Sequence, residues 1–123
     1  MEDAEHSLRA LAQLYFDAAY DMDANKFASI FHPECSVSRV GDDGAVSVTP
    51  IESWLAAVRK IEAPKTLGLD RRDRILTIDV VRELALLKLE LQMPPRYMTD
   101  MLMCLRVGGT WKIAQKIWTV ETR

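Results

Sequence analysis

The sequence is poor in several features that would assign a protein to a specialised class. It holds 2 cysteines among 123 residues, Cys35 and Cys104, and neither lies near a histidine at the spacing of a metal site. The first residues are acidic and helical in pattern, which is not typical of a signal peptide. We therefore expect reduced thiols, no metal site and a cytoplasmic protein.

A basic excess and long apolar runs are also missing. The formal net charge of −2 argues against a nucleic-acid partner, and no apolar run is long enough to cross a bilayer. No glycine-rich phosphate loop or Ser-His-Asp order is present, so we expect no cofactor. Hydrophobic residues make up 49% and charged residues 28%, and there is no linker or repeat, which indicates a single domain over residues 1–123.

The first half of the chain predicts helices around a small hairpin. Apolar residues between residues 3 and 22 recur in steps of three and four, as on one amphipathic helix. A short second helix is expected from residue 24 to about 30, where His32 and Pro33 stop it. Strands are expected at residues 34–40 and 45–48, and a third helix follows from about residue 50 and ends before Pro64.

The second half, residues 75–122, predicts four long antiparallel strands because apolar residues alternate at period two. Gly108 and Gly109 suit the positive φ angles of a two-residue hairpin. Pro94 and Pro95 separate the second strand from the third, since proline donates no hydrogen bond to a sheet. Helices followed by a long meander indicate an α+β fold with one twisted sheet.

Local patterns from both halves carry a resemblance to a known family. They are Tyr15-Phe16, the run Asp23, Lys26, Phe27, Phe31, His32, Pro33 and Glu34, the trio Tyr97, Thr99 and Asp100, and the closing Gly109-Thr110-Trp111-Lys112-Ile113.

With these patterns the chain resembles the nuclear transport factor 2-like superfamily of cone-shaped, cystatin-like folds, and within it the lumazine-binding group. The resemblance implies about three helices packed on a curved, mixed and mostly antiparallel sheet of about six strands. Its relatives include ketosteroid isomerase and SnoaL-like proteins, so the superfamily mixes enzymes with non-catalytic modules. Arg82-Glu83 departs from the Gly-Asp pair that is usual at that hairpin.

Ketosteroid isomerase offers a test for catalysis, because it needs a tyrosine, an aspartate base and a protonated aspartate. Counting along the chain matches Tyr15 to the tyrosine, but Arg39 to the base and Met103 to the protonated acid. Neither replacement can perform that chemistry at neutral pH. The isomerase mechanism is therefore not expected.

By the same counting, the side chains of Lys116 and Trp118 point into the cone, and those of Met101, Met103 and Leu105 point into it from the neighbouring strand. Asp100 is then expected to point outward. Lys116 is either a stem lying on the core with its charge at the mouth, or a functional residue, that is, an anion anchor or a lysine of lowered pKa. The candidate pocket residues are Tyr15, Arg39, Trp54, Met103, Lys116 and Trp118.

Two cations inside one cone would repel each other, so we expect a bound anion between Arg39 and Lys116 unless an internal acid such as Asp79 lies there. The first hypothesis for function is a pocket for a small planar or anionic molecule. One alternative is an enzyme of the dehydratase, cyclase or isomerase kind that uses Tyr15, His32 or Lys116 for acid–base chemistry. Another is a non-catalytic dimerisation module.

The last two strands are apolar on both of their faces, which predicts a covered outer face and hence a homodimer. The candidate interface residues are Met98, Leu102, Cys104, Ile113 and Ile117.

Overall fold

The computed structural model describes residues 3–123. It contains three helices and six strands, as the resemblance implies. In chain order they are α1 (Ala4–Asp21), α2 (Ala24–Ala28), β1 (Phe31–Val40), β2 (Val46–Pro50), α3 (Ile51–Val58), β3 (Arg72–Val81), β4 (Leu84–Met93), β5 (Arg96–Val107) and β6 (Thr110–Thr122).

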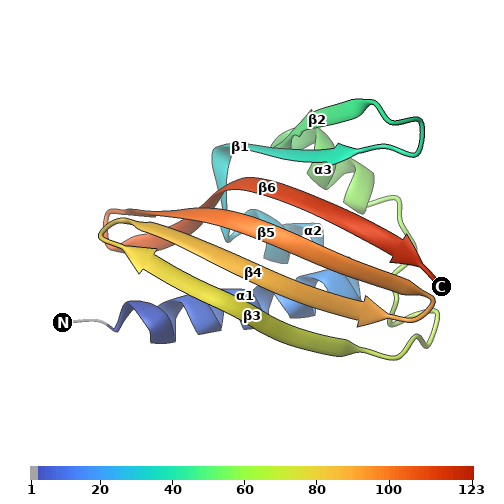
Figure 1. Ribbon diagram of the computed structural model, residues 1–123, viewed down its shortest axis with the longest axis horizontal. Helices are drawn as coiled ribbons and strands as arrows, with labels where there is room; N and C mark the ends of the chain where they lie inside the picture. Colours follow the sequence, from blue (N-terminus) through green and yellow to red (C-terminus); the bar gives the residue numbers. More distant parts are fainter. Residues whose placement is uncertain (1–2) are drawn as a thin grey trace.

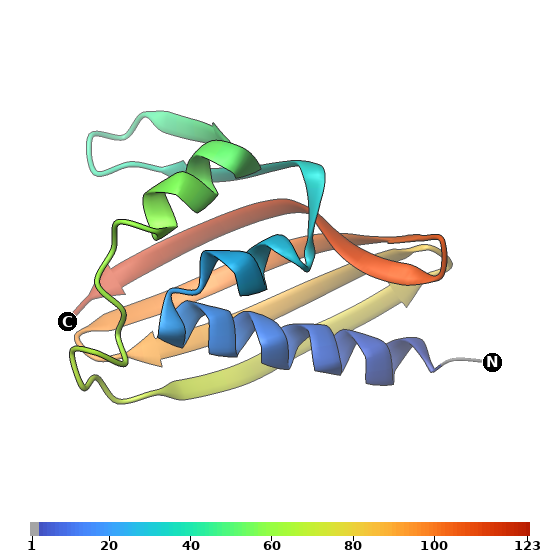
Figure 2. The same ribbon diagram turned by 180° about the vertical axis from the view of Figure 1, so that it is seen from behind.

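The six strands form one mixed sheet in the order β2-β1-β6-β5-β4-β3. All neighbours are antiparallel except β1 and β6, which are parallel. The helices lie on one side of the sheet, behind it in Figure 1 and in front of it in Figure 2. We call the side that faces the helices the inner face and the opposite side the outer face.

Helix α1 combines an apolar stripe along one face with favourable capping residues at both ends. The Asp3 carboxylate accepts a hydrogen bond from the Glu5 backbone N–H at 3.0 Å, which satisfies one of the free donors of the first turn. Met22 ends the helix in the left-handed region, with φ of 47°. The stripe containing Leu8, Ala12 and Tyr15 is almost fully buried on the sheet.

The hairpin expectations are confirmed. Gly108 and Gly109 have φ angles of 58° and 82° at the β5–β6 turn, the positive values that a two-residue hairpin requires. Pro94 and Pro95 form the β4–β5 turn. Arg82, at the β3–β4 turn, adopts a φ of 56° although it is not glycine.

Some element bounds differ from the expected ones. Strand β1 begins at Phe31, so His32 and Pro33 lie inside a strand, α2 ends at Ala28, β2 runs to Pro50 and β3 starts at Arg72. Helix α3 ends before Pro64, as expected. Proline is tolerated in β1 because the regular pairing of β1 with β6 is interrupted between Phe31 and Ser36.

A bulge in β6 overturns the expected facing of β5. A two-residue turn without a bulge would set Met101 opposite Lys116, but the register shifts after Cys104 and Ile113, and Leu102 is the partner of Lys116. The extra residue is Ala114. One extra residue changes every later partner by one and therefore exchanges the two faces of the partner strand.

Several facing predictions are therefore wrong. Asp100, expected outside, is buried on the inner face, and Met103, expected in the pocket, is 46% exposed on the outer face. The proposed interface residues Leu102, Cys104 and Ile113 are buried in the core, and Met98 packs against that core. Ile117 lies outside as expected and is 60% exposed.

Candidate functional site

A cavity of about 400 Å³ opens between the helices and the inner face of the sheet. Its wall is mostly apolar, and it is built by α1, α3, the segment of residues 61–69 and the inner face of β4, β5 and β6. A volume of this size is typical of sites for small molecules. Four of the sequence-predicted pocket residues line it: Tyr15, Trp54, Lys116 and Trp118.

Three polar side chains meet on the wall of this cavity. The Tyr15 hydroxyl of α1 donates a hydrogen bond to Asp100 Oδ2 of β5 at 2.5 Å, and Lys116 Nζ of β6 lies 3.6 Å from the same oxygen. All three residues are at most 5% exposed. Asp100 Oδ1 has no hydrogen-bond donor within the described residues, although it is buried.

Burial and charge act in opposite directions on Lys116. Removal from water lowers the pKa of its ammonium group, because the charged form loses its hydration, while the Asp100 carboxylate opposes this shift. Burial raises the pKa of Tyr15 well above its usual value, and the neighbouring Asp100 charge raises it further. Tyr15 is therefore a hydrogen-bond donor at neutral pH.

Aromatic rings enclose the lysine head. Lys116 Nζ lies 4.3 Å from the ring centre of Trp54 and 5.3 Å from those of Tyr15 and Trp118. Phe27 holds Trp54 in place through an edge contact, with ring centres 4.9 Å apart. Flat π faces beside an ammonium group stabilise its charge and leave flat surfaces for a ring-shaped ligand.

Arg39 does not line this cavity, so the predicted pair of cations inside one pocket is wrong. Its guanidinium lies over the Trp118 ring at 4.7 Å and 3.9 Å from Asp42 Oδ1, beside a second hollow. Trp118 is shared by the two hollows. The acid that pairs Lys116 is Asp100, whereas Asp79 is exposed on β3.

His32 is also outside the cavity. Its Nδ1 accepts a hydrogen bond from the Glu34 backbone N–H at 3.0 Å, so the imidazole supports the start of β1.

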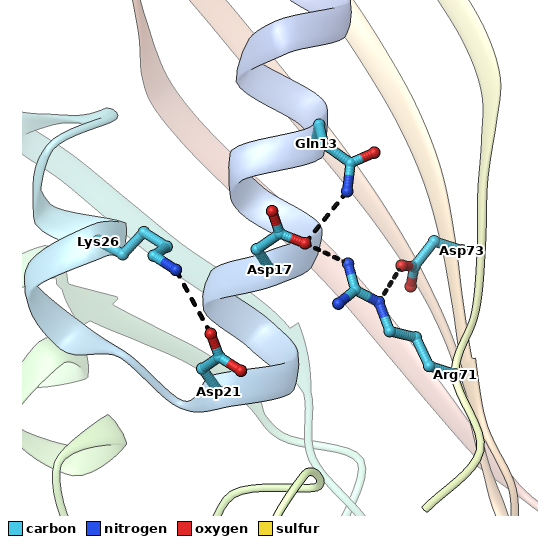
Figure 3. A network of polar contacts seen from close by, with 6 residues as sticks. All are labelled: Gln13, Asp17, Asp21, Lys26, Arg71 and Asp73. Atoms are coloured by element: carbon cyan, nitrogen blue, oxygen red, sulfur yellow. Dashed lines mark hydrogen bonds and ion pairs between the residues drawn. The ribbon is translucent and has the colours of Figure 1, made fainter.

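A polar network fixes the segment that forms one wall of the cavity. Arg71 donates to Asp17 of α1 and to Asp73 of β3, as Figure 3 shows, and its guanidinium lies 5.2 Å from the Tyr20 ring. The Tyr20 hydroxyl donates to the Leu69 carbonyl at 2.8 Å. These bonds hold residues 61–69 against α1.

A second ion pair in Figure 3 joins the two N-terminal helices. Lys26 Nζ of α2 lies 3.4 Å from Asp21 Oδ2 at the end of α1. The turn between these helices is thereby fixed next to the cavity residue Met22.

The two cysteines are buried and free. Burial raises the pKa of Cys35 to about 11 and that of Cys104 to about 12, so both are thiols at neutral pH. Within residues 3–123, no group of three or more His, Cys, Asp and Glu side chains is placed to hold a metal ion. No helix of this described part is long and apolar enough to cross a membrane.

Asp100 is the site residue that the sequence analysis missed. Counting from the β5–β6 turn placed Met103 at the acid position, but the bulge at Ala114 brings Asp100 beside Tyr15 instead. The available signal was polarity, because Asp100 is the only charged residue between Tyr97 and Leu105. The alternation of apolar and polar residues could not show which face of β5 is buried, because both faces carry apolar residues.

A helical layer on a curved mixed sheet, with a cavity between the two, defines the nuclear transport factor 2-like class of α+β folds. The sequence model of the family described as "Putative lumazine-binding" matches residues 3–119. The chain belongs to this family.

Solved structures agree on the fold. An NTF2-like protein of unknown function from Shewanella baltica superposes with a TM-score of 0.85 at 17% identity, with 100% of both chains covered. One from Silicibacter pomeroyi has a TM-score of 0.81 at 22% identity and covers 98% of this chain and 100% of its own. A ketosteroid isomerase-like protein from Erwinia carotovora gives 0.76 at 10% identity, with 100% of both chains covered. No curated protein matches the sequence.

Proposed function

We propose that the protein binds a small, planar and uncharged molecule in the cavity between the helices and the sheet. The molecule carries a hydrogen-bond donor next to an acceptor on one edge. Its donor bonds to Asp100 Oδ1, its acceptor receives a bond from Lys116, and its ring lies among Trp54, Trp118 and Tyr15.

The unpaired Asp100 Oδ1 carries this proposal. A buried carboxylate oxygen without a donor costs free energy, and a bound N–H or O–H group removes that cost. Lys116 is the adjacent donor, since an ammonium group has three N–H bonds and Asp100 Oδ2 engages one side of it. Together they match the N–H and C=O edge of a cyclic amide or imide.

Charge favours an uncharged ligand over the anion expected at first. The Lys116 ammonium is neutralised by Asp100 at 3.6 Å, and Arg39 lies outside the cavity. The further cation on the cavity wall, Arg96 at the start of β5, is exposed to solvent. An anion beside Lys116 would therefore enter a mostly apolar space next to the Asp100 carboxylate, which is unfavourable.

The family description names lumazine, a flat bicyclic heterocycle with such an imide edge, which makes it a suitable probe. Isothermal titration calorimetry with lumazine, and with a derivative methylated on the imide nitrogen, tests the edge directly. We expect binding of lumazine and at least tenfold weaker binding of the methylated compound, the equivalent of about 1.4 kcal/mol.

Asp100→Asn provides the matched protein control, because the amide keeps an acceptor for Tyr15 but removes the charge. It should weaken lumazine and leave the already weak methylated compound unchanged. Equal affinity of the wild type for both compounds would contradict recognition of the imide edge. Binding of benzoate in preference to lumazine would support the earlier hypothesis of a pocket for anions.

We also propose a homodimer through the outer face, a surface distinct from the cavity. Strands β4, β5 and β6 expose a run of large apolar side chains there, and no helix of the described chain covers it in Figure 1. We call this run the outer apolar patch: Leu84, Met101, Met103, Leu105 and Ile117.

An identical copy fits the outer apolar patch because a two-fold interface sets the same surface against itself. The neighbouring outer residues Lys88 and Glu90 of β4 carry opposite charges, so the rim is compatible with its own copy.

A further inference from the structure

Lys116 differs from every other lysine of the chain in its surroundings. It is 5% exposed and lines the cavity, whereas Lys26, Lys60, Lys65, Lys88 and Lys112 are half-buried or exposed. An amine enclosed by apolar walls is the setting in which lysines become nucleophiles toward carbonyl carbons.

We propose that Lys116 is a carbonyl-reactive lysine that forms an imine with planar aromatic aldehydes or ketones entering the cavity. This inference goes beyond ligand binding but uses the same cavity. The rings of Trp54, Trp118 and Tyr15 surround the Lys116 nitrogen. They favour a flat, uncharged carbonyl compound over a sugar phosphate or a keto acid, which carry charge.

The Asp100 carboxylate supplies the proton transfers that the step needs. The ammonium of Lys116 gives a proton to Asp100 Oδ2, 3.6 Å away, and becomes a neutral amine. This transfer removes two buried charges together, so an apolar cavity does not oppose it strongly. Burial acts in the same direction, because it lowers the lysine pKa.

The bonds and protons then balance within the site. The amine nitrogen attacks the carbonyl carbon, and one proton of that nitrogen passes to the carbonyl oxygen, which gives a neutral carbinolamine. Asp100 returns a proton to the carbinolamine hydroxyl, the C–O bond breaks and water leaves, which gives a protonated imine beside the Asp100 carboxylate. No oxidant or reductant is consumed.

Tyr15 holds Asp100 in place for this exchange. Its hydroxyl donates to Oδ2 at 2.5 Å, so the carboxylate cannot rotate freely, and Oδ2, the oxygen that exchanges the proton, stays beside the Lys116 amine. Tyr15 is thus a positioning residue for the step.

Reductive trapping in the wild-type protein tests the inference. The protein is incubated at pH 7 with 2-naphthaldehyde and sodium cyanoborohydride, which reduces an imine to a stable secondary amine, and the rate of modification is measured at each lysine by peptide mass mapping. We expect Lys116 to be modified at least ten times faster than any other lysine. Modification of Lys116 at the same rate or more slowly would overturn the proposal.

The variant Asp100→Asn separates catalysis from simple trapping. We expect it to slow modification at Lys116 by at least tenfold, in line with the loss of a general acid–base group, without changing the rates at the exposed lysines. An unchanged rate at Lys116 would remove Asp100 from the mechanism. Lys116→Met should abolish the fast adduct; if this variant fails to fold, the comparison among wild-type lysines still decides.

The outcomes are independent of the lumazine titration. Binding of lumazine without fast modification of Lys116 would leave the binding function and reject the imine. Fast modification of Lys116 without lumazine binding would support the imine and reject the proposed binding function.

Discussion

At the scale of single residues, the pairing of Lys116 with Asp100 is the feature with the largest energetic consequences. Both side chains are almost completely removed from water, which is costly for each ion taken alone. Their mutual attraction, the Tyr15 hydrogen bond and the surrounding rings offset that cost. A pair of this kind is far more sensitive to the loss of one partner than to the loss of both charges.

Lys116→Met should therefore lower the free energy of unfolding by about 3–5 kcal/mol, because it leaves a buried carboxylate without a cation. Urea denaturation at pH 7 measures this change.

The double variant Asp100→Asn/Lys116→Met is the matched control, since it contains neither charge and the introduced amide can still accept from Tyr15. It should recover part of the loss seen in Lys116→Met. A double variant less stable than the single one would mean that the two charges do not depend on each other.

At the scale of elements, Arg71 joins α1 to the start of β3. Its guanidinium donates to Asp73, two residues further along the chain, and to Asp17 of α1, which lies within reach because residues 61–69 return along α1. The hydrogen bond from Arg71 lowers the pKa of the Asp17 carboxyl group below its usual value.

The sign of the pH effect follows from this lowered pKa. The stabilisation from ionised Asp17 is fully present above the pKa of the unfolded chain, about 3.9 for aspartate. It is lost as the pH falls through the lower, folded pKa. Since the Asp17 side chain is 39% exposed, solvent screens the pair, and we expect a contribution of only about 0.5–1 kcal/mol.

Asp17→Asn should thus destabilise the protein by that amount at pH 7 and by progressively less below pH of about 4. Thermal unfolding across this range checks it. Asp70→Asn is the control, because Asp70 is 75% exposed and 3.7 Å from Arg72. A difference between wild type and Asp17→Asn that grows as the pH falls would contradict the assignment.

At the scale of the whole molecule, the sheet has one face covered by helices and one face with a large uncovered apolar area. The inner face supplies the core and the cavity, and the outer apolar patch lies on the opposite side of the same strands. The proposed ligand binding and the proposed self-association can therefore be disturbed separately.

Ile117→Asp should convert the proposed dimer to a monomer, because it would place an unpaired charge within the outer apolar patch, where Ile117 is 60% exposed. Light scattering coupled to size-exclusion chromatography at micromolar concentration measures the mass. Ala56→Asp makes the same change of charge at an exposed position on α3 and should leave the mass unchanged. A monomeric wild type would reject the dimer.

The cavity residues differed in how far the sequence could place them. Tyr15 and Trp54 were found because helical spacing sets their direction from neighbouring residues alone. Lys116 was conspicuous as a cation within an apolar strand. Met103 and Arg39 were misplaced, because their positions depend on the register between strands and on the course of β1 beside Trp118.

The sequence by itself determined the fold class, the amphipathic α1 and the tight β5–β6 turn, since each of these follows from local periodicity or from backbone freedom at glycine. Only the tertiary structure decided the bulge at Ala114, which no glycine or proline marks. It also decided the pairing of Tyr15 with Asp100, which are 85 residues apart. The physical reason is that β5 is apolar on both faces, so alternation could not tell them apart, and only the closing of β5 against β6 turned Asp100 toward the cavity.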